Sequence, residues 1–141
     1  GPLVADLMVN ISNTDADFVV KLIDVLPVDE KPNPATKYPM GGYQMLVRGD
    51  IMRGRYRNSF SNPEAFVPNK ATQVKFTMPD VAHTFKKGHR MMVQIQSSWF
   101  PLADRNPQQF VDIYHAKDSD FVKETIHVYL DQSKLILPVL K

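Results

Sequence analysis

The sequence predicts an all-β fold, in which two antiparallel sheets pack face to face or one sheet closes into a barrel. Short runs of residues alternate between apolar and polar side chains, which is the period-two pattern of strands with one face in a core. Eleven prolines separate the apolar runs, where they favour turns and argue against long helices. No amphipathic helix of useful length is visible. We therefore expect seven or eight short strands in an antiparallel sandwich or barrel.

The first two predicted strands differ in how they are buried. Residues 3–11 carry apolar side chains at every odd position, as a strand with one buried face does. Residues 18–25 are apolar on both parities apart from Lys21 and Asp24, which is typical of a central strand covered on both faces. Pro27 ends this strand and is followed by a polar, proline-bearing loop.

The middle of the chain contains two further strand patterns. Residues 43–56 are predicted to form one or two strands bent at Gly49. Gly54 lies inside this pattern, where a glycine indicates a bulge or a close approach of the backbone to a neighbour. After a loop, residues 72–78 alternate cleanly and predict another strand with one face in the core.

The run from Phe85 to Pro107 contains a turn, a strand and an aromatic loop. Lys87-Gly88 supplies the turn, since glycine accepts positive φ. In residues 91–97 the side chains of Met91, Val93, Ile95 and Ser97 point the same way, toward a predicted core. Trp99-Phe100-Pro101 then breaks the alternation and leads into a charged segment. Two neighbouring aromatic side chains on a loop need a surface that covers them.

The C-terminal part predicts short elements. Residues 125–130 and 135–139 are strand patterns, and a helical turn is expected near residues 120–123 or Gln108. The 141 residues suit one domain, 1–141, which is large enough to bury roughly 68–70% of its unfolded surface. Gly1-Pro2 fits a scar left by tag cleavage and stands directly before a strand pattern. We therefore expect a fragment of a longer polypeptide.

The composition excludes several classes of site and partner. The chain has no cysteine, so disulfides and thiolate metal sites are excluded, while the compartment stays open between periplasm, secretion and cytosol. A net charge of +2 gives no reason to expect a polyanion partner, and no apolar run is long enough to cross a bilayer. We expect neither nucleic acid nor membrane as a partner, and no cofactor.

Three ordered motifs carry a resemblance to a known family. They are residues 14–25, residues 53–57, and residues 88–107 with Ser97-Ser98-Trp99-Phe100-Pro101 and Asp104-Arg105-Asn106-Pro107. The chain resembles the C-terminal domain of the X-Pro dipeptidyl-peptidase and cocaine-esterase family of serine hydrolases. Within that family it is most similar to the α-amino-acid ester hydrolases, also called cephalosporin or glutaryl acylases.

The resemblance implies a galactose-binding-like jelly-roll sandwich attached to a catalytic α/β-hydrolase domain and a helical cap. In such enzymes the α/β-hydrolase domain carries the Ser-Asp-His triad, and its serine forms the acyl-enzyme. Because that domain is N-terminal, the catalytic residues are expected upstream of Gly1. The family's strand or strands before the Gly-Pro are missing here, which predicts an incomplete sandwich edge. Any homo-oligomer is expected to form through the parent enzyme.

The residues of this chain favour no catalytic or metal site. None of its serines has the glycine frame of a nucleophile elbow, and the four histidines lack the spacing of a zinc-protease helix. His89 is expected to bond to a loop carbonyl. Asp15, Asp17 and Asp24 lack the spacing of a calcium loop, so turn capping and ion pairing are the preferred roles.

Three arginines could form a nucleic-acid-binding surface. Strand alternation would put Arg53, Arg55 and Arg57 on one face, where a basic stripe can follow phosphates. Carboxylates such as Asp24, Asp50 and Glu64 are available as partners, and buried arginines commonly pair with carboxylates. With the family resemblance, we favour a structural or domain-docking cluster.

Trp99, Phe100, Arg105 and Asn106 are the candidate docking residues. Aromatic and arginine side chains dominate interface energetics, and a loop framed by prolines loses little entropy on binding. We therefore expect this loop to contact the hydrolase and cap domains of the same polypeptide and to help shape the active-site cleft. The local alternative is that the two aromatics cap the sandwich's own end. The alternative function is a carbohydrate- or calcium-binding jelly roll with Trp99 and Phe100 as its aromatic platform.

Overall fold

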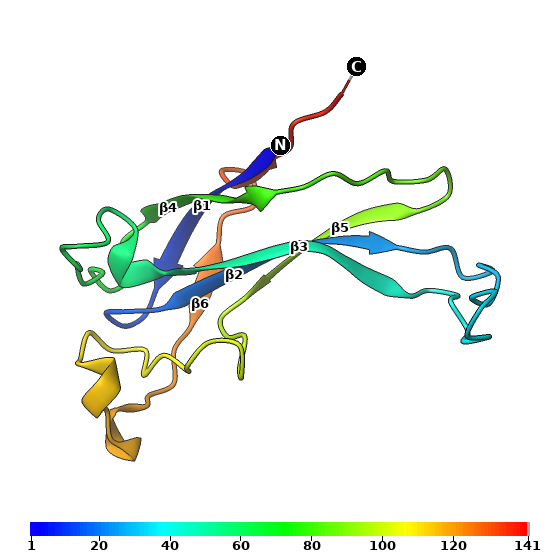
Figure 1. The fold of residues 1–141 in the computed structure, drawn as a ribbon. Helices are drawn as coiled ribbons and strands as arrows, with labels where there is room; N and C mark the ends of the chain where they lie inside the picture. The colour runs from blue at the N-terminus through cyan, green and yellow to red at the C-terminus, as the bar shows by residue number, and fades with distance from the viewer. Residues whose placement is uncertain (141) are drawn as a thin grey trace.

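The computed structural model describes residues 1–140 and contains two antiparallel sheets packed face to face (Figure 1). The first sheet contains, in spatial order, β4 (Thr72–Asp80), β1 (Pro2–Ile11) and then both β6 (Ile126–Val128) and β7 (Lys134–Ile136). The second sheet contains β3 (Gln44–Arg53), β2 (Asp17–Val25) and β5 (Arg90–Gln96). The predicted all-β sandwich is confirmed.

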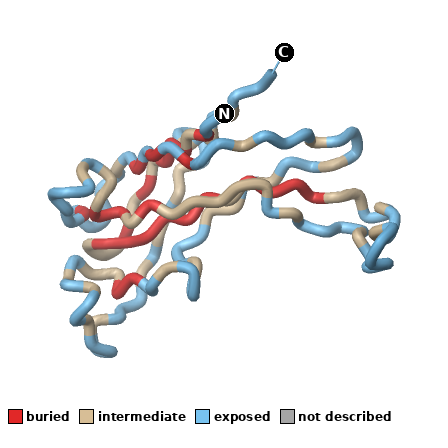
Figure 2. The backbone as a smooth tube through the Cα atoms, in the orientation of Figure 1, coloured by how far each residue is buried: buried red, intermediate tan, exposed pale blue. Residues whose placement is uncertain are grey.

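The core lies between the two central strands, β1 and β2 (Figure 2). Every odd residue of β1 from Leu3 to Ile11 is buried, as the alternation predicts. From the second sheet, Phe18, Val20 and Leu22 point into the same cluster. The even residues Val74, Phe76 and Met78 of β4 complete it. Each such side chain contributes about 1.5–3 kcal/mol on burial, so this cluster supplies most of the driving force for folding.

The pairing of β2 with β3 contains one irregularity. Leu22 pairs with Arg48 and Ile23 with Leu46, so Val47 is an extra residue on β3. The predicted bend at Gly49 is therefore wrong by two residues, because Gly49 itself pairs regularly with Lys21. The strand pattern of residues 43–56 forms one strand, which ends at Arg53 where the 3₁₀ turn η1 (Gly54–Tyr56) begins.

The C-terminal elements are shorter than the sequence patterns suggest. The runs 125–130 and 135–139 form only the three-residue strands β6 and β7. Two 3₁₀ turns are present, η2 (Ile113–His115) and η3 (Asp118–Asp120), and η3 overlaps the predicted turn at 120–123 only at Asp120. Short strands fit here because each pairs with β1 over only three positions.

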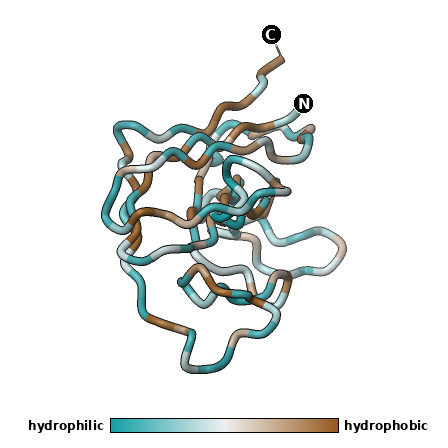
Figure 3. Tube along the Cα trace, turned by 90° about the vertical axis from the view of Figure 1, so that its left-hand side faces the viewer, coloured by the Kyte–Doolittle hydropathy of each residue, from teal (hydrophilic) through white to brown (hydrophobic). Residues whose placement is uncertain are grey.

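The two ends of the described chain lie at one end of the sandwich (Figures 1 and 3). The amino group of Gly1 donates to the carbonyl of Val81 at 2.9 Å. The C-terminal end of the tube extends away from the sandwich and is largely hydrophobic in Figure 3. Val139 and Leu140 in this stretch are exposed. The loop of residues 26–43, which follows β2, projects away from the core (Figure 1).

Candidate functional site

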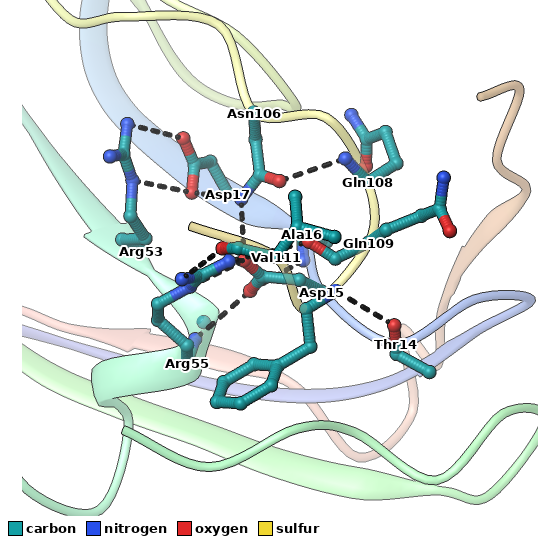
Figure 4. A network of polar contacts seen from close by, with 12 residues as sticks. Thr14, Asp15, Ala16, Asp17, Arg53, Arg55, Asn106, Gln108, Gln109 and Val111 are labelled. Atoms are coloured by element: carbon teal, nitrogen blue, oxygen red, sulfur yellow. Dashed lines mark hydrogen bonds and ion pairs between the residues drawn. The ribbon is translucent and has the colours of Figure 1, made fainter. Parts of the chain in front are cut away.

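A buried ion pair between Asp15 and Arg55 lies at the centre of a polar network (Figure 4). Asp15 is fully buried, and its Oδ2 accepts from Arg55 Nε at 2.7 Å. Its Oδ1 accepts from the backbone N–H groups of Ala16 and Arg55 at 3.0 and 3.2 Å. Breaking one partner of a buried pair costs about 3–5 kcal/mol, so the turn before β2 and η1 are fixed to each other.

Asn106 joins this pair to a second carboxylate. Its Nδ2 donates to Asp15 Oδ2 at 3.1 Å and to Asp17 Oδ1 at 2.9 Å, while its Oδ1 accepts from the backbone N–H of Gln108 (Figure 4). Arg53 donates to both oxygens of Asp17 and to the carbonyl of Asp104 at 3.0 Å. The chain between Asp104 and Gln108 is thus bound to β2 and β3.

Burial raises the pKa of the Asp17 carboxyl above its ordinary value. The hydrogen bond from Asn106 and the charge of Arg53 lower this pKa but only partly offset the burial. Asp17 therefore depends on Asn106 and Arg53 to stay ionised inside the domain.

Arg55 also holds the following segment, residues 109–111. Its Nη1 donates to the carbonyl of Val111 at 2.8 Å and its Nη2 to that of Gln109 at 3.3 Å. The guanidinium lies 4.8 Å from the ring centre of Phe110, whose backbone N–H donates to Thr14 Oγ1. One side chain from η1 therefore fixes the loop after Asn106, which has no regular secondary structure of its own.

The three arginines do not form a basic stripe. The chain turns into η1 after Arg53, so the strand alternation that would align them stops there. Arg57 stacks on Phe66 at 4.0 Å and donates to the carbonyls of Gly54 and Glu64. The favoured structural role of these arginines agrees with these contacts, and the premise of a common face is wrong.

Gly54 makes the close backbone approach that its position predicts. Its N–H donates to the carbonyl of Ala16 at 2.8 Å. A Cβ at this position would lie 2.6 Å from that carbonyl oxygen and 2.6 Å from the Phe66 ring. Only glycine lets η1 sit this near to the turn that carries Asp15.

Trp99 packs on the outer face of the second sheet. Lys21 Nζ lies 4.3 Å from its ring centre. A Cβ on Gly49 would lie 2.6 Å from Trp99 Cη2, so the ring rests directly on the glycine backbone. Lys21 and Gly49 are paired across β2 and β3, on the side away from Val20 and the core. Trp99 therefore contacts its own sandwich, but on the face of a sheet and not at the sandwich end, where the local alternative places both aromatics.

The segment from Trp99 to Asn106 thus crosses the outer face of β2 and β3. Trp99 covers Lys21 and Gly49 at one end, and Arg53 binds Asp104 at the other. Val19 lies between these contacts on β2 and is fully buried although it does not belong to the core cluster. This explains why β2 is apolar on both parities.

Several apolar side chains of residues 100–122 are exposed, although contacts of Trp99, Asp104 and Asn106 hold the backbone of this segment on the sandwich. Phe100 is 66% exposed and Leu102 is 69% exposed, and both follow Trp99 directly. Arg105 lies over Phe121 at 5.3 Å and is exposed. The further exposed apolar side chains of this segment are Phe110, Tyr114, Phe121 and Val122. We call residues 99–122 the apolar segment.

The four predicted docking residues therefore all lie in the apolar segment, but their side chains differ in exposure. Phe100 and Arg105 are exposed, Trp99 is half-buried, and Asn106 is buried inside the polar network. Sequence reasoning missed Arg55 as the residue that holds residues 109–111. Its partners lie more than fifty positions away, and no local pattern indicates them.

A second polar cluster, centred on the buried carboxylate of Asp24, joins β2 to the β4–β5 connection. His83 Nε2 lies 2.9 Å from Asp24 Oδ2, and His89 Nδ1 lies 2.8 Å from Asp24 Oδ1. The expected bond of His89 to a loop carbonyl is wrong, because the buried carboxylate of Asp24 lies nearer. Burial favours a higher pKa for Asp24, but the hydrogen bonds from the two histidines outweigh it and lower that pKa.

The three aspartates of the calcium hypothesis do not converge. Asp15 and Asp17 bind arginine and asparagine side chains, whereas Asp24 binds the two histidines. Within residues 1–140, no group of three or more His, Asp or Glu side chains is arranged to hold a metal ion. In the same residues no helix has the length and apolar character to cross a membrane.

The fold and the anchored segment define a class of protein, the antiparallel β-sandwich domain. The chain belongs to the family of X-Pro dipeptidyl-peptidase C-terminal non-catalytic domains, whose family model matches residues 1–134. It is thus a non-catalytic C-terminal domain of this hydrolase family, as the sequence motifs indicate.

Known proteins similar to this chain are longer hydrolases. Cocaine esterase of Rhodococcus sp. (strain MB1 Bresler) is 35% identical over 106 residues, which are 75% of this chain and 16% of the esterase. A solved α-amino acid ester hydrolase labelled with selenomethionine superposes with a TM-score of 0.91 at 46% identity, covering 99% of this chain and 23% of that one. An aminopeptidase from a marine sediment archaeon, Thaumarchaeota archaeon, gives 0.90 at 42% identity, covering 100% and 23%. The chain therefore spans less than a quarter of these relatives.

Proposed function

We propose that this domain docks through its apolar segment against the α/β-hydrolase and cap domains of its parent serine hydrolase. The observation that carries the proposal is a set of exposed apolar side chains on a segment whose backbone is fixed by buried contacts. Exposed apolar groups that gather in one patch mark interaction sites. A segment that is already ordered loses little entropy on binding.

The side chains of the segment have two different roles in the proposed docking. Phe100, Leu102 and Arg105 are exposed and supply the contact, while Trp99 and Asn106 hold the backbone that carries them. Full burial of an exposed Phe or Leu side chain contributes about 1.5–3 kcal/mol. Two or three such side chains are enough to hold a domain that is already tethered by its own chain.

The role of the docked domain is architectural. The relatives carry esterase, ester hydrolase and aminopeptidase names, and the proposed parent hydrolyses esters or amides of α-amino-acid acyl compounds through an acyl-serine. A rigid domain beside the cleft fixes its walls and excludes water from the acyl intermediate. In this proposal the 141 residues support the walls of the active-site cleft, and the catalytic residues belong to the parent's hydrolase domain.

The test is the double variant Phe100→Ala/Leu102→Ala in the full-length parent, with Val28→Ala as control. Val28 is 88% exposed but lies in the loop after β2, away from the apolar segment. We expect proteolytic release of the domain to accelerate about tenfold or more, which corresponds to a loss of about 1.4 kcal/mol of contact energy. Release at the rate of the control would contradict the proposal.

The alternative function is binding of a carbohydrate. The observation that favours it is the exposure of aromatic side chains, since Phe100 and Tyr114 are exposed and aromatic rings stack on sugar rings. A glycan screen on the parent distinguishes the two functions. Saturable binding that is lost in Phe100→Ala favours the alternative, and its absence leaves docking as the role of the segment.

A further inference from the structure

A pocket of about 400 Å³ lies between β3 and β4, on the side of the sandwich opposite β5. Residues 50–52 of β3 and residues 75–77 of β4 form two of its walls. Residues 56–60, from η1 and the loop after it, form the third. Ligand pockets of proteins measure about 300–1,000 Å³, so this pocket has room for a small molecule.

The pocket has an apolar base and aromatic walls. Met52 and Phe76 belong to the core cluster and are only 8% and 7% exposed, so they form the base. Tyr56 is partly buried against the same cluster. Phe60 also lines the pocket but is 80% exposed. An apolar group placed here would cover the Phe60 ring and remove apolar surface from water.

The loop that carries Phe60 is fixed by its own hydrogen bonds. Arg57 donates to the carbonyl of Glu64 at 2.8 Å, and Asn58 Nδ2 donates to Glu64 Oε2 at 2.7 Å. Ser59 Oγ accepts from two backbone N–H groups further along the loop. A ligand therefore meets a wall that is already ordered, so binding costs little conformational entropy.

Asp50 places a carboxylate in the β3 wall of the pocket. Its Oδ1 accepts from the backbone N–H of Ile51 at 2.8 Å. Within residues 1–140, none of the ion pairs involves Asp50. The sequence offers it as a partner for Arg53, Arg55 and Arg57, but these arginines bind other groups. A half-buried carboxylate without an ion pair favours a cationic group on the ligand.

Lys75 supplies the opposite charge from the β4 wall. Its Nζ lies 3.9 Å from Asp6 Oδ2, and its side chain is 56% exposed. Asp6 keeps other partners without it, because Lys134 Nζ also lies 3.9 Å away and Gln73 donates to Asp6 at 2.7 Å. An exposed ion pair of this kind is weak, and the flexible stem of lysine lets its ammonium group turn to a ligand.

We propose that this pocket binds a free α-amino acid with an aromatic or large aliphatic side chain. Its ammonium group pairs with Asp50 and its carboxylate with Lys75. Its side chain lies on Met52 and Phe76, beside Phe60. A ligand with one charge fits less well, because an anion would meet Asp50 and a cation would meet Lys75. A zwitterion is complementary to both walls.

The site is separate from the docking proposed above, because no residue of the apolar segment lines this pocket. A parent that hydrolyses esters or amides of α-amino acids would release molecules of the proposed class. The pocket would then bind the parent's own product, a link that rests on the proposed function, whereas the site itself does not.

Equilibrium dialysis of the full-length parent against labelled L-phenylalanine tests the site. We expect Asp50→Asn and Lys75→Gln each to weaken binding at least about tenfold, since each removes one charged contact. The controls Asp29→Asn and Lys31→Gln make the same changes of charge on the exposed loop after β2 and should leave binding unchanged. Phe60→Ala should also weaken binding, and a side chain so exposed is not needed for folding.

Two analogues of phenylalanine assign its charged groups to the two residues. Phenylpropionate lacks the ammonium group and phenethylamine lacks the carboxylate, so each should bind the unsubstituted parent at least about tenfold more weakly than L-phenylalanine. In Asp50→Asn, L-phenylalanine should lose its advantage over phenylpropionate. In Lys75→Gln it should lose its advantage over phenethylamine.

Two outcomes overturn the inference. One is equal binding of L-phenylalanine by Asp50→Asn, Lys75→Gln and their controls, which assigns all binding to the active site of the hydrolase domain. The other is the absence of saturable binding to the parent. Phe100→Ala/Leu102→Ala should bind L-phenylalanine as the unsubstituted parent does, whether or not the docking proposal holds.

Discussion

At the scale of single residues, Asn106 is important for stability because its side-chain amide donates hydrogen bonds to two buried carboxylates, Asp15 and Asp17. We expect Asn106→Ala to destabilise the 141-residue chain by about 2–3 kcal/mol, since both Asp15 and Asp17 lose a donor and the pKa of Asp17 rises further. Urea unfolding measures this. Asn62→Ala, on an exposed loop, is the control and should change stability by less than about 0.5 kcal/mol.

Glu124 makes a pH-dependent contribution to stability. Its pKa is about 7 in the folded chain against 4.5 as the ordinary value, so the folded state holds the proton more tightly. The associated stabilisation is present below pH 4.5 and is lost as the pH rises through 7. Because Glu124 is only half-buried, we expect about 1 kcal/mol after allowing for solvent screening.

The measurement is urea unfolding of the 141-residue chain at pH 5 and pH 8, with Glu124→Gln as the matched variant. The difference between the two pH values should shrink by about 1 kcal/mol in Glu124→Gln. An unchanged difference would show that the carboxyl titrates near its ordinary pKa.

At the scale of elements, the contact between Trp99 and the Gly49 backbone holds the apolar segment on β2 and β3. In Gly49→Ala the new Cβ would lie 2.6 Å from Trp99 Cη2, so the ring must leave its place. We expect protease cleavage between residues 99 and 105 to accelerate, with only a small loss in global stability, because the core lies on the other face.

A second substitution shows whether the clash with Trp99 is the cause. Trp99→Leu removes the atoms that the new Cβ would meet, so Gly49→Ala should add no further cleavage in that background. If the two changes are additive, the effect of Gly49→Ala comes from the strand backbone, and the contact does not hold the segment.

The alternation of a strand predicts which side chains face inward, but not whether another layer covers them. In β1 the odd residues are all buried, because β2 and the second sheet lie opposite. In β5 the same kind of pattern leaves Val93 exposed, because the strand lies at an open edge. The pattern of Arg53 to Arg57 misled for another reason: the chain leaves the strand at Gly54, where packing against Ala16 and Phe66 overrides it.

The candidate site was predictable only in part, because its bonds join residues far apart in the sequence. The motif around Trp99 and Asn106 marks the segment, and its aromatics suggest contact. The partner of Asn106, however, is set by how the loop returns to β2, about ninety positions earlier. The pairing of His89 with Asp24 is equally non-local. Such pairs follow from strand order and register, which composition and periodicity do not determine.

At the scale of the whole molecule, the domain presents two kinds of incomplete surface. The apolar segment is ordered and exposed, which suits docking against a separate domain. On the side between β5 and β6, within residues 1–140, β5 pairs with β2 alone and Val93 is left partly exposed. Both surfaces fit a domain that spans less than a quarter of its relatives. Isolation from the parent should therefore expose more apolar surface than a self-contained sandwich of this size does.

Hydrogen exchange of the apolar segment tests the docking most directly. Peptides from residues 99–122 are compared between the 141-residue chain and the full-length parent, with peptides from the exposed loop at residues 28–40 as the reference. We predict that exchange in residues 99–122 slows in the parent while the reference loop stays unchanged. Equal exchange of residues 99–122 in both proteins would contradict the docking role.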